Sequence, residues 1–275
     1  MNANTYNVLQ ERFGFDALRP LQAKIVERVL AGGDALVVMP TGGGKSLCYQ
    51  LPALVQQTER GGGNAGVALV FSPLIALMED QVAALRKKNI RATYINSTLG
   101  RAEREKRQQG IADGEYEIVY ATPERMNRPG FPEALDACPG GVRLLAIDEA
   151  PCISKWGHDL RPAYRDVGTF RERLGTPVTI ALTATATAPV REDIRSVIGR
   201  TEDEMPLFAS GIDRPNLDLN VREVWDDADK AAALADVAST HPGTGIAYFT
   251  LIKDLERMVP VVKKALPDCA LEVYH

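Results

Sequence analysis

The sequence has little of what marks several large classes of protein. Only four cysteines are present, and no two form a CxxC pair: Cys48, Cys138, Cys152 and Cys269. This spacing disfavours a zinc site or a disulfide framework and is typical of a reducing cytosol. The longest apolar stretch, Val67–Met78, is broken by Ser72 and Pro73 and is too short to span a bilayer. We therefore expect a cytoplasmic protein without a membrane partner.

The chain also lacks a basic excess. It has 32 Lys and Arg against 36 Asp and Glu, for a net charge of −4, so any nucleic-acid site has to be a local patch. The first sixteen residues carry Glu11 and Asp16 and no apolar core, so we expect no secretory signal. At 275 residues, 45% hydrophobic and 25% charged, the sequence predicts one large or two modest globular domains.

Short apolar runs alternate with helical patterns along the chain. We predict buried strands at Ala35–Met39, Val67–Phe71, Ala92–Ile95, Ile118–Ala121, Val142–Ile147 and Val178–Leu182. Helical patterns between them include Leu74–Lys87, Arg101–Ala112 and Val190–Val197. Near-continuous apolar strands alternating with helices predict an α/β fold with a parallel sheet covered on both faces. Ligands of such sheets bind at the carboxyl ends of the strands.

A glycine-rich turn follows the first predicted strand and precedes a helical segment from Leu47 to about Gln56. Such a turn lets several backbone N–H groups converge on one phosphate chain, and the helix adds its positive end. Because Met39 occupies the position of the usual first glycine, six residues carry the loop: Thr41, Gly42, Gly43, Gly44, Lys45 and Ser46. A glycine-rich turn that precedes a lysine by chance is disfavoured by the flanking strand and helix.

Within this loop, Lys45 can reach the β- and γ-phosphates, and the Ser46 hydroxyl can ligate Mg²⁺. Upstream, Gln22 lies near the start of a predicted helix from Pro20 to Leu30 and offers the donor and acceptor that the edge of adenine requires. Phe15 and Arg19 can pack on the two faces of the base. Taken alone, a Gln at a helix start is more often a solvated residue.

Two acids end the fifth predicted strand. Asp148 can hold Mg²⁺ through its water shell, and Glu149 can orient and deprotonate the attacking water. An exposed acidic pair after a strand is common by itself. Downstream of a phosphate loop on the same sheet, it predicts nucleotide hydrolysis with ATP and Mg²⁺.

Several other strand ends carry candidate nucleic-acid contacts. Ser72 and Thr122 each precede a proline and a helix start that can hold a backbone phosphate, although a simple helix cap explains each equally well. The loop from Cys152 to Tyr164 gathers Trp156, His158 and Arg161. These suit stacking on bases and neutralising phosphate, and the alternative is a core-packing loop.

A Thr-Ala-Thr sequence follows the sixth predicted strand. The hydroxyls of Thr183 and Thr185 can hydrogen-bond the acids Asp148 and Glu149 across the sheet edge and so couple the motifs. Ser and Thr are ordinary at strand ends, so this signal is weak by itself.

Together these motifs resemble superfamily 2 nucleic-acid helicases, and closely the RecQ family of DNA helicases. The loop from Cys152 to Tyr164 is the most specific part of the resemblance, which runs from about Phe13 to Tyr274. Its other carriers are Phe15/Arg19-Pro20/Gln22, Thr41–Ala53, Ser72–Leu74, Ala121–Arg125, Asp148–Ala150, Leu182–Ala186 and Arg214–Leu217.

The resemblance implies two RecA-like lobes, an ATP-binding lobe over residues 1–210 and the start of an incomplete second lobe over 211–275. It implies a monomer that couples ATP hydrolysis to 3′→5′ translocation on single-stranded DNA and to duplex unwinding in DNA repair and recombination. The cytoplasmic, nucleoid-associated protein would have single-stranded and duplex DNA as partners. In the second lobe we expect strands at 217–224, 245–249 and 270–274 and helices at Lys230–Ser239 and Leu251–Leu266.

Three departures from the family pattern matter. Pro151 stands where the acid motif ends in His, and Leu160 where the aromatic loop has Phe. The arginine-bearing motif of the second lobe is absent, so we expect a C-terminally truncated protein that binds ATP and hydrolyses it slowly. Two alternatives stay open: a truncated ATP- and nucleic-acid-binding fragment without motor activity, and an RNA helicase of the same superfamily.

Overall fold

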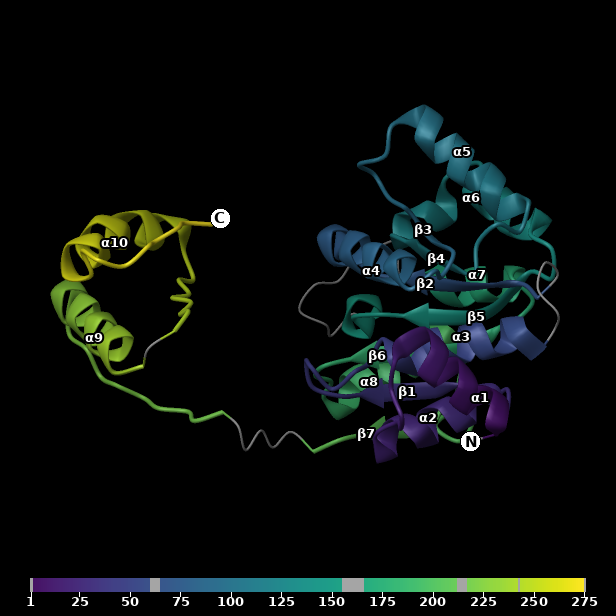
Figure 1. The fold of residues 1–275 in the computed structure, drawn as a ribbon, viewed down its shortest axis with the longest axis horizontal. Helices are drawn as coiled ribbons and strands as arrows, with labels where there is room; N and C mark the ends of the chain where they lie inside the picture. The colour runs from purple at the N-terminus through teal and green to yellow at the C-terminus, as the bar shows by residue number, and fades with distance from the viewer. Residues whose placement is uncertain (1, 60–64, 155–165, 212–216, 242, 275) are drawn as a thin grey trace. The chain divides into compact units, whose positions relative to one another are not determined.

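A computed structural model describes residues 2–59, 65–154, 166–211, 217–241 and 243–274 (Figure 1). The chain divides into two compact units, Met1–Asp213 and Arg214–His275. Each unit is described separately below.

A seven-stranded parallel sheet forms the centre of the first unit, with the strand order β3-β4-β2-β5-β6-β1-β7. Its strands are β1 Ala35–Val38, β2 Val67–Phe71, β3 Ala92–Ile95, β4 Ile118–Ala121, β5 Val142–Ile147, β6 Val178–Thr183 and β7 Leu207–Ala209. The predicted α/β class and six of these strands are confirmed. β7 was not predicted, because this edge strand is only three residues long and partly buried.

Helices cover both faces of the sheet (Figure 1). They are α1 Ala3–Val8, α2 Pro20–Leu30, α3 Leu47–Glu59, α4 Ile75–Lys87, α5 Arg101–Ala112, α6 Phe131–Ala137, α7 Val167–Arg173 and α8 Ala188–Ile198. Successive residues of a strand serve different cores, since Val37 packs into one apolar cluster and Leu36 into the other. No helix in the described ranges is long and apolar enough to cross a bilayer.

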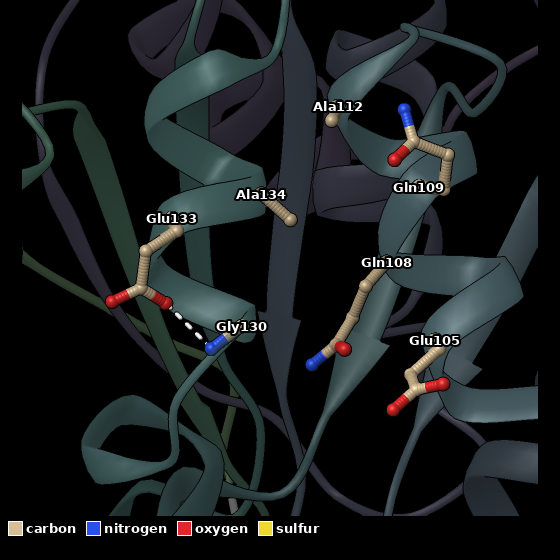
Figure 2. A pocket seen from close by; sticks show the side chains of 7 residues that line it. All are labelled: Glu105, Gln108, Gln109, Ala112, Gly130, Glu133 and Ala134. Carbon is tan, nitrogen blue, oxygen red and sulfur yellow. Dashed lines mark hydrogen bonds between the residues drawn. The ribbon is translucent and has the colours of Figure 1, made fainter. Parts of the chain in front are cut away.

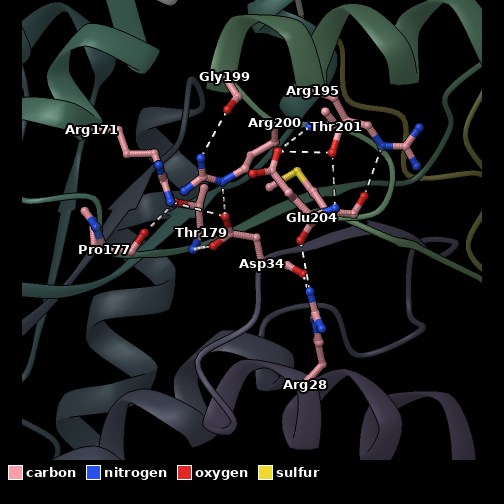
Figure 3. A network of polar contacts seen from close by, with 11 residues as sticks. Arg28, Asp34, Arg171, Pro177, Thr179, Arg195, Gly199, Arg200, Thr201 and Glu204 are labelled. Atoms are coloured by element: carbon pink, nitrogen blue, oxygen red, sulfur yellow. Dashed lines mark hydrogen bonds and ion pairs between the residues drawn. The ribbon is translucent and has the colours of Figure 1, made fainter.

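An ion network joins β1, β6, α7 and α8 at the end of the sheet where β1 begins (Figure 3). The buried Asp34 carboxylate accepts from Arg171 Nη2 at 3.2 Å and from Arg200 Nε at 2.6 Å. Its other oxygen accepts from the Thr179 backbone N–H at 2.7 Å. Burial lowers the pKa of Arg171, and the charge of Asp34 opposes that effect. One carboxylate therefore pairs with two guanidinium groups, of which Arg171 is buried and Arg200 is partly exposed.

We predict that Asp34→Asn strongly destabilises the first unit. Losing the charge leaves buried Arg171 uncompensated, a change that costs about 3–5 kcal/mol in comparable buried pairs. The free energy of unfolding in urea measures the effect. Asp136→Asn is the matched control, because its 2.6 Å pair with Arg173 is about half exposed at 46% and 44% and should leave stability nearly unchanged. Equal effects of the two substitutions would contradict the assigned role of Asp34.

The second unit consists of two packed helices, α9 Asp227–Thr240 and α10 Ile252–Ala265. Ala231, Met258 and Val262 form its small core. Both helices were predicted to within three residues at each end. The strand predictions at 217–224, 245–249 and 270–274 are wrong for the described part of this unit, where these segments have no regular secondary structure.

The physical reason is a lack of pairing partners. A strand satisfies its backbone N–H and C=O groups only beside another strand, and two helices do not supply one. Most apolar side chains of these segments consequently face solvent, with Val221 98% exposed and Tyr248 87% exposed, whereas Phe249 and Leu271 pack against the small core. The composition that predicted the strands is present, but the sheet that would bury them is not formed.

Candidate nucleotide and nucleic-acid site

The parallel pairing brings the predicted motifs together at the carboxyl ends of the strands, which we call the sheet edge. Val38 of β1 pairs with Thr183 of β6, and Ile147 of β5 pairs with Phe71 of β2. The edge therefore carries, strand by strand, the phosphate loop after β1, the threonine turn after β6 and the acids after β5. The turns at Ser72 and Thr122 follow after β2 and β4. Only β6 separates β1 from β5, so these two strands lie about 10 Å apart.

The phosphate loop has a backbone that only glycine suits. Gly42 and Gly44 have φ angles of +79° and +83°. Gly43 donates its N–H to the Pro40 carbonyl at 2.9 Å, and a Cβ at Gly43 would lie 2.8 Å from that oxygen. The Ser46 carbonyl accepts the N–H of Gln50, in the first turn of α3, at 3.0 Å. The loop therefore continues directly into that helix, at whose start a phosphate is predicted to bind.

Two predicted adenine-binding residues hold this loop from the side. The buried Gln22 amide donates to the carbonyls of Gly43 at 3.3 Å and Gly44 at 3.1 Å. Its oxygen accepts the Arg19 N–H at 2.9 Å, while Arg19 Nη1 donates to the Gly42 carbonyl at 3.2 Å. The structure therefore joins Gln22 and Arg19 to the phosphate loop, and their contact with a base stays a prediction.

Two further predicted ligand contacts differ in their surroundings. Lys45 donates from Nζ to the Met39 carbonyl at 3.1 Å, a contact that a phosphate would replace. Phe15 lies just before α2 with 51% of its surface exposed, so its ring is accessible for stacking on a base.

We predict that Gly44→Ala weakens nucleotide binding by at least about tenfold while leaving a folded protein. A Cβ at Gly44 would lie 2.3 Å from Gln22 Nε2, so the loop and Gln22 cannot keep their present contact. Gly32→Ala is the matched control, because its φ of +85° is equally unfavourable but nothing lies within 4 Å. Both substitutions should cost about 1–2 kcal/mol of stability through backbone strain.

Calorimetric titration with a non-hydrolysable ATP analogue separates the two variants. Only Gly44→Ala should lose at least about tenfold in affinity, a difference of about 1.4 kcal/mol. Equal affinities would show that the Gln22 contact does not shape the nucleotide site.

The two acids at the end of β5 differ in their surroundings. Asp148 continues the sheet by donating its N–H to the Phe71 carbonyl at 2.8 Å. Burial raises the pKa of Asp148 to about 6, the charge of Glu149 adds to the rise, and Lys45 opposes it. Glu149 has left-handed backbone angles, φ 51° and ψ 50°, which cost energy for a residue with a Cβ. Such strain is typical of functional residues.

The oxygen atoms at this site suit Mg²⁺, an ion that proteins seldom enclose with side chains alone. Mg²⁺ is usually bound by one or two protein oxygen ligands together with phosphate oxygens and waters. Ser46 and Asp148 offer one hydroxyl and one carboxylate, and a cation would relieve the repulsion between Asp148 and Glu149. The described residues contain no group of three or more His, Cys, Asp or Glu that converge as metal ligands. The predicted Mg²⁺ ligands therefore fit the ion chemically, and ligation itself stays a prediction.

We predict that Asp148→Asn raises the midpoint of thermal unfolding without ligand by a few degrees, because it removes a buried charge beside Glu149. The same substitution should weaken Mg²⁺-dependent binding of an ATP analogue by about tenfold or more. Glu149→Gln, which removes the predicted base and not a metal ligand, should retain binding. Unchanged Mg²⁺ dependence in Asp148→Asn would contradict the assignment.

The residues predicted to contact nucleic acid or to couple the motifs divide into three groups. Ser72 and Thr122 are 2% and 5% exposed, so any phosphate held there contacts mainly the N–H groups that follow them. Ser72 Oγ accepts one of these, from Leu74, at 3.5 Å. Trp156, His158 and Arg161 lie outside the residues that the structure describes.

The threonine turn forms the third group. The Thr183 hydroxyl donates to the Thr185 carbonyl at 3.0 Å and accepts the Thr185 N–H at 3.1 Å. This closes the turn locally, in place of the expected bond to the acids. A coupling role for Thr183 and Thr185 stays a prediction.

Two residues that the sequence analysis missed lie at the same edge. Asn96 follows β3 and is fully buried, and its Nδ2 finds no acceptor among the described residues. Arg125, three residues beyond Thr122, likewise has a buried Nε without an acceptor in the described ranges. Burial lowers the pKa of Arg125, and the positive charges of Arg104 and Arg128 lower it further. Unused donors beside clustered arginines suit an anion such as a backbone phosphate.

The two donors could have been found from the sequence only by their position. Asn96 directly follows a predicted strand and Arg125 closes the Thr-Pro-Glu-Arg turn, but both residue types are common in surface loops. Their unused hydrogen-bonding groups are visible only in the folded chain.

A separate hollow of about 380 Å³ lies between α5 and α6 (Figure 2). Glu105, Gln108 and Glu133 are among its lining residues, and Glu133 accepts the Gly130 N–H at 2.6 Å. None of the predicted site residues lines this hollow. It is therefore distinct from the edge that carries the motifs.

The DEAD/DEAH box helicase family matches residues 19–194, which include the phosphate loop and the acids. This chain belongs to that family. Over 97% of its length it is 37% identical to the "Probable ATP-dependent DNA helicase RecS" of Bacillus subtilis and covers 51% of that protein. It is 38% identical over 94% of its length to the RecQ ATP-dependent DNA helicase of the same organism and covers 42% of it. The predicted resemblance to RecQ helicases is confirmed, and the chain spans about half the length of these relatives.

Solved helicase structures have the same fold. The DUF1998 helicase MrfA bound to DNA superposes with a TM-score of 0.74 at 18% identity, over 96% of this chain and 38% of that one. A hypothetical ATP-dependent RNA helicase from Sulfolobus tokodaii gives a TM-score of 0.57 at 18% identity, over 96% of this chain and 80% of that one. At these identities the likeness supports the fold alone.

Proposed function

We propose that this chain is the ATP-binding part of a RecQ-type DNA helicase, in which ATP hydrolysis drives 3′→5′ movement along single-stranded DNA and unwinding of the duplex. The observation that carries the proposal is the single sheet edge on which the phosphate loop, the acids and the unused donors Asn96 and Arg125 all lie. The names of the RecS and RecQ relatives, which are ATP-dependent DNA helicases, support DNA as the substrate.

In this proposal the phosphate loop binds the β- and γ-phosphates. Lys45 exchanges its Met39 carbonyl for a phosphate oxygen, and the glycine N–H groups orient the chain of phosphates. Mg²⁺, when bound by Ser46 and Asp148, neutralises charge on the phosphates. Glu149 orients the attacking water and accepts its proton, and Phe15, Arg19 and Gln22 select adenine.

The nucleic acid would lie along the same edge, beyond the acids. The turns at Ser72 and Thr122 would hold successive backbone phosphates through their N–H groups, with Arg125 supplying positive charge. Trp156, His158 and Arg161 would contact bases and phosphates and relay that contact to the acids. Thr183 and Thr185, at and just beyond the end of β6, would take part in this coupling. Pro151, at the start of the 3₁₀ helix Ala150–Ile153, stands where the family pattern has His. Its side chain cannot form a hydrogen bond between the nucleotide site and the nucleic-acid site.

In the proposed domain organisation, residues 1–210 form the ATP-binding lobe and residues 211–275 begin a second RecA-like lobe. We propose a role in DNA repair and recombination for the whole protein, which acts as a cytoplasmic, nucleoid-associated monomer. A second candidate is an ATP- and nucleic-acid-binding protein without motor activity, and the observation that favours it is Pro151. A third is an RNA helicase, because the predicted phosphate contacts do not distinguish DNA from RNA.

ATP turnover by the full chain, with and without single-stranded DNA, tests the proposal. Turnover that DNA stimulates and that Lys45→Ala abolishes is the expected result, since removing the lysine removes a phosphate ligand. A single-stranded RNA of matched length forms the second arm, and stronger stimulation by RNA would favour the RNA helicase.

ATP binding without any stimulated turnover would favour the non-motor alternative. Failure of the chain to bind ATP at all would overturn the proposal.

A further inference from the structure

A buried hydrogen-bond network extends from the phosphate loop beneath the sheet edge. We name it the tyrosine–glutamine network, and its members are Tyr49 and Gln50 of α3, Gln81 of α4 and Tyr120 of β4. The hydroxyls of Tyr49 and Tyr120 are 3.2 Å apart. Gln50 Nε2 donates to Tyr120 Oη at 2.9 Å and to Gln81 Oε1 at 3.0 Å. Both amide hydrogens of Gln50 are therefore used within the network.

The network begins at the predicted Mg²⁺ ligands. The Ser46 carbonyl accepts the backbone N–H groups of Tyr49 at 3.3 Å and Gln50 at 3.0 Å, and the Asp148 charge acts on Tyr49 and Tyr120. Burial raises the pKa of Tyr120 to about 12, so its hydroxyl stays protonated and hydrogen-bonding at neutral pH. A cation or phosphate that moved Ser46 or Asp148 would thus change the field and the geometry at Tyr49.

The network reaches two elements that carry the predicted nucleic-acid turns, β4 and α4. Tyr120 is the second residue before Thr122, on the strand that leads into that turn. Gln81 lies on α4, the helix that starts directly after the Ser72–Leu74 turn. Three elements that each meet the sheet edge are therefore joined below it by polar contacts, where the other neighbours are apolar.

Purely structural packing does not require this chemistry. The rings of Tyr49 and Tyr120 already pack edge to face with centroids 6.5 Å apart, and two phenylalanines would preserve that contact. Placing two hydroxyls and an amide in a core costs free energy unless every group is paired. A fully paired polar network specifies one geometry, which is the property needed to pass a small displacement between elements.

We propose that the tyrosine–glutamine network positions the Ser72 and Thr122 turns in response to nucleotide binding, and so couples the ATP site to the nucleic-acid site within one lobe. This inference rests on the proposed function. Its members are positioning residues and touch neither ligand. By reciprocity, a network that lets the nucleotide change nucleic-acid affinity must let nucleic acid change nucleotide affinity by the same factor.

The test is a thermodynamic cycle on the full chain. The dissociation constant of a fluorescent oligothymidylate is measured with and without Mg²⁺ and a non-hydrolysable ATP analogue. The ratio of these two dissociation constants measures the coupling between nucleotide and nucleic-acid binding. We expect a ratio that differs from one by about fivefold or more in the unmodified protein. Tyr120→Phe should bring the ratio to within about twofold of one, with little change in nucleotide affinity.

Two further variants keep the test decisive. Tyr94→Phe is the matched control, because Tyr94 lies on neighbouring β3, contacts Arg107 through its ring and lies outside the network. It should retain the full ratio. Gln81→Ala breaks the other branch at a half-buried position of α4 and should also reduce the ratio, even if Tyr120→Phe proves unstable.

The outcomes are distinct. A wild-type ratio retained in both Tyr120→Phe and Gln81→Ala, with only the unfolding temperature lowered, would show a structural role and overturn the inference. Tight binding of both ligands with a ratio of one in the unmodified protein would also overturn it, while the proposed nucleotide site would stand. Absence of nucleotide binding would instead overturn the proposed function.

Discussion

The parallel pairing of β1, β6 and β5 is the constraint on which the rest of this structure depends. Parallel strands end at one edge, so the loop after β1 and the acids after β5 face the same region although about a hundred residues separate them in the chain. An antiparallel β5 would send Asp148 to the opposite edge. The buried β6 between them sets their spacing, and the apolar clusters on both faces keep that spacing fixed.

The two edges of this sheet differ in how completely their polar groups are paired. At the edge where β1 begins, one Asp34 carboxylate satisfies two arginines and a backbone N–H. At the other edge the Asp148 pKa is raised, Glu149 has a left-handed backbone, and donors of Asn96 and Arg125 lack acceptors within the described residues. Stability is concentrated at the first edge, whereas the second keeps charge and donors available for ligands.

Much of this arrangement could be predicted from the sequence because it depends on local patterns. Apolar runs gave the six longer strands, and the loop glycines at 42 and 44 have the positive φ angles that the motif requires. The second unit could not be predicted in the same way. Its apolar segments are strand-like in composition, but strands form only where partners exist, and pairing is not a local property.

Side-chain partners were also beyond prediction. Nothing in the sequence indicated that Gln22 hydrogen-bonds the loop backbone or that the Thr183 hydroxyl closes its own turn. Asn96, Arg125 and the tyrosine–glutamine network depend on contacts between distant elements, which no spacing in the sequence encodes. The sequence pattern therefore predicts which residues lie at the sheet edge, but it does not predict which atoms their side chains contact there.

The central claim is that the phosphate loop and the acids form one nucleotide site. Amide hydrogen exchange of the full chain, with and without Mg²⁺ and a non-hydrolysable ATP analogue, tests it most directly. We expect slower exchange at both Gly42–Leu47 and Ile147–Ala150, because one ligand contacts both segments. Slower exchange at the loop alone, or at neither segment, would show that the loop and the acids do not form one nucleotide site.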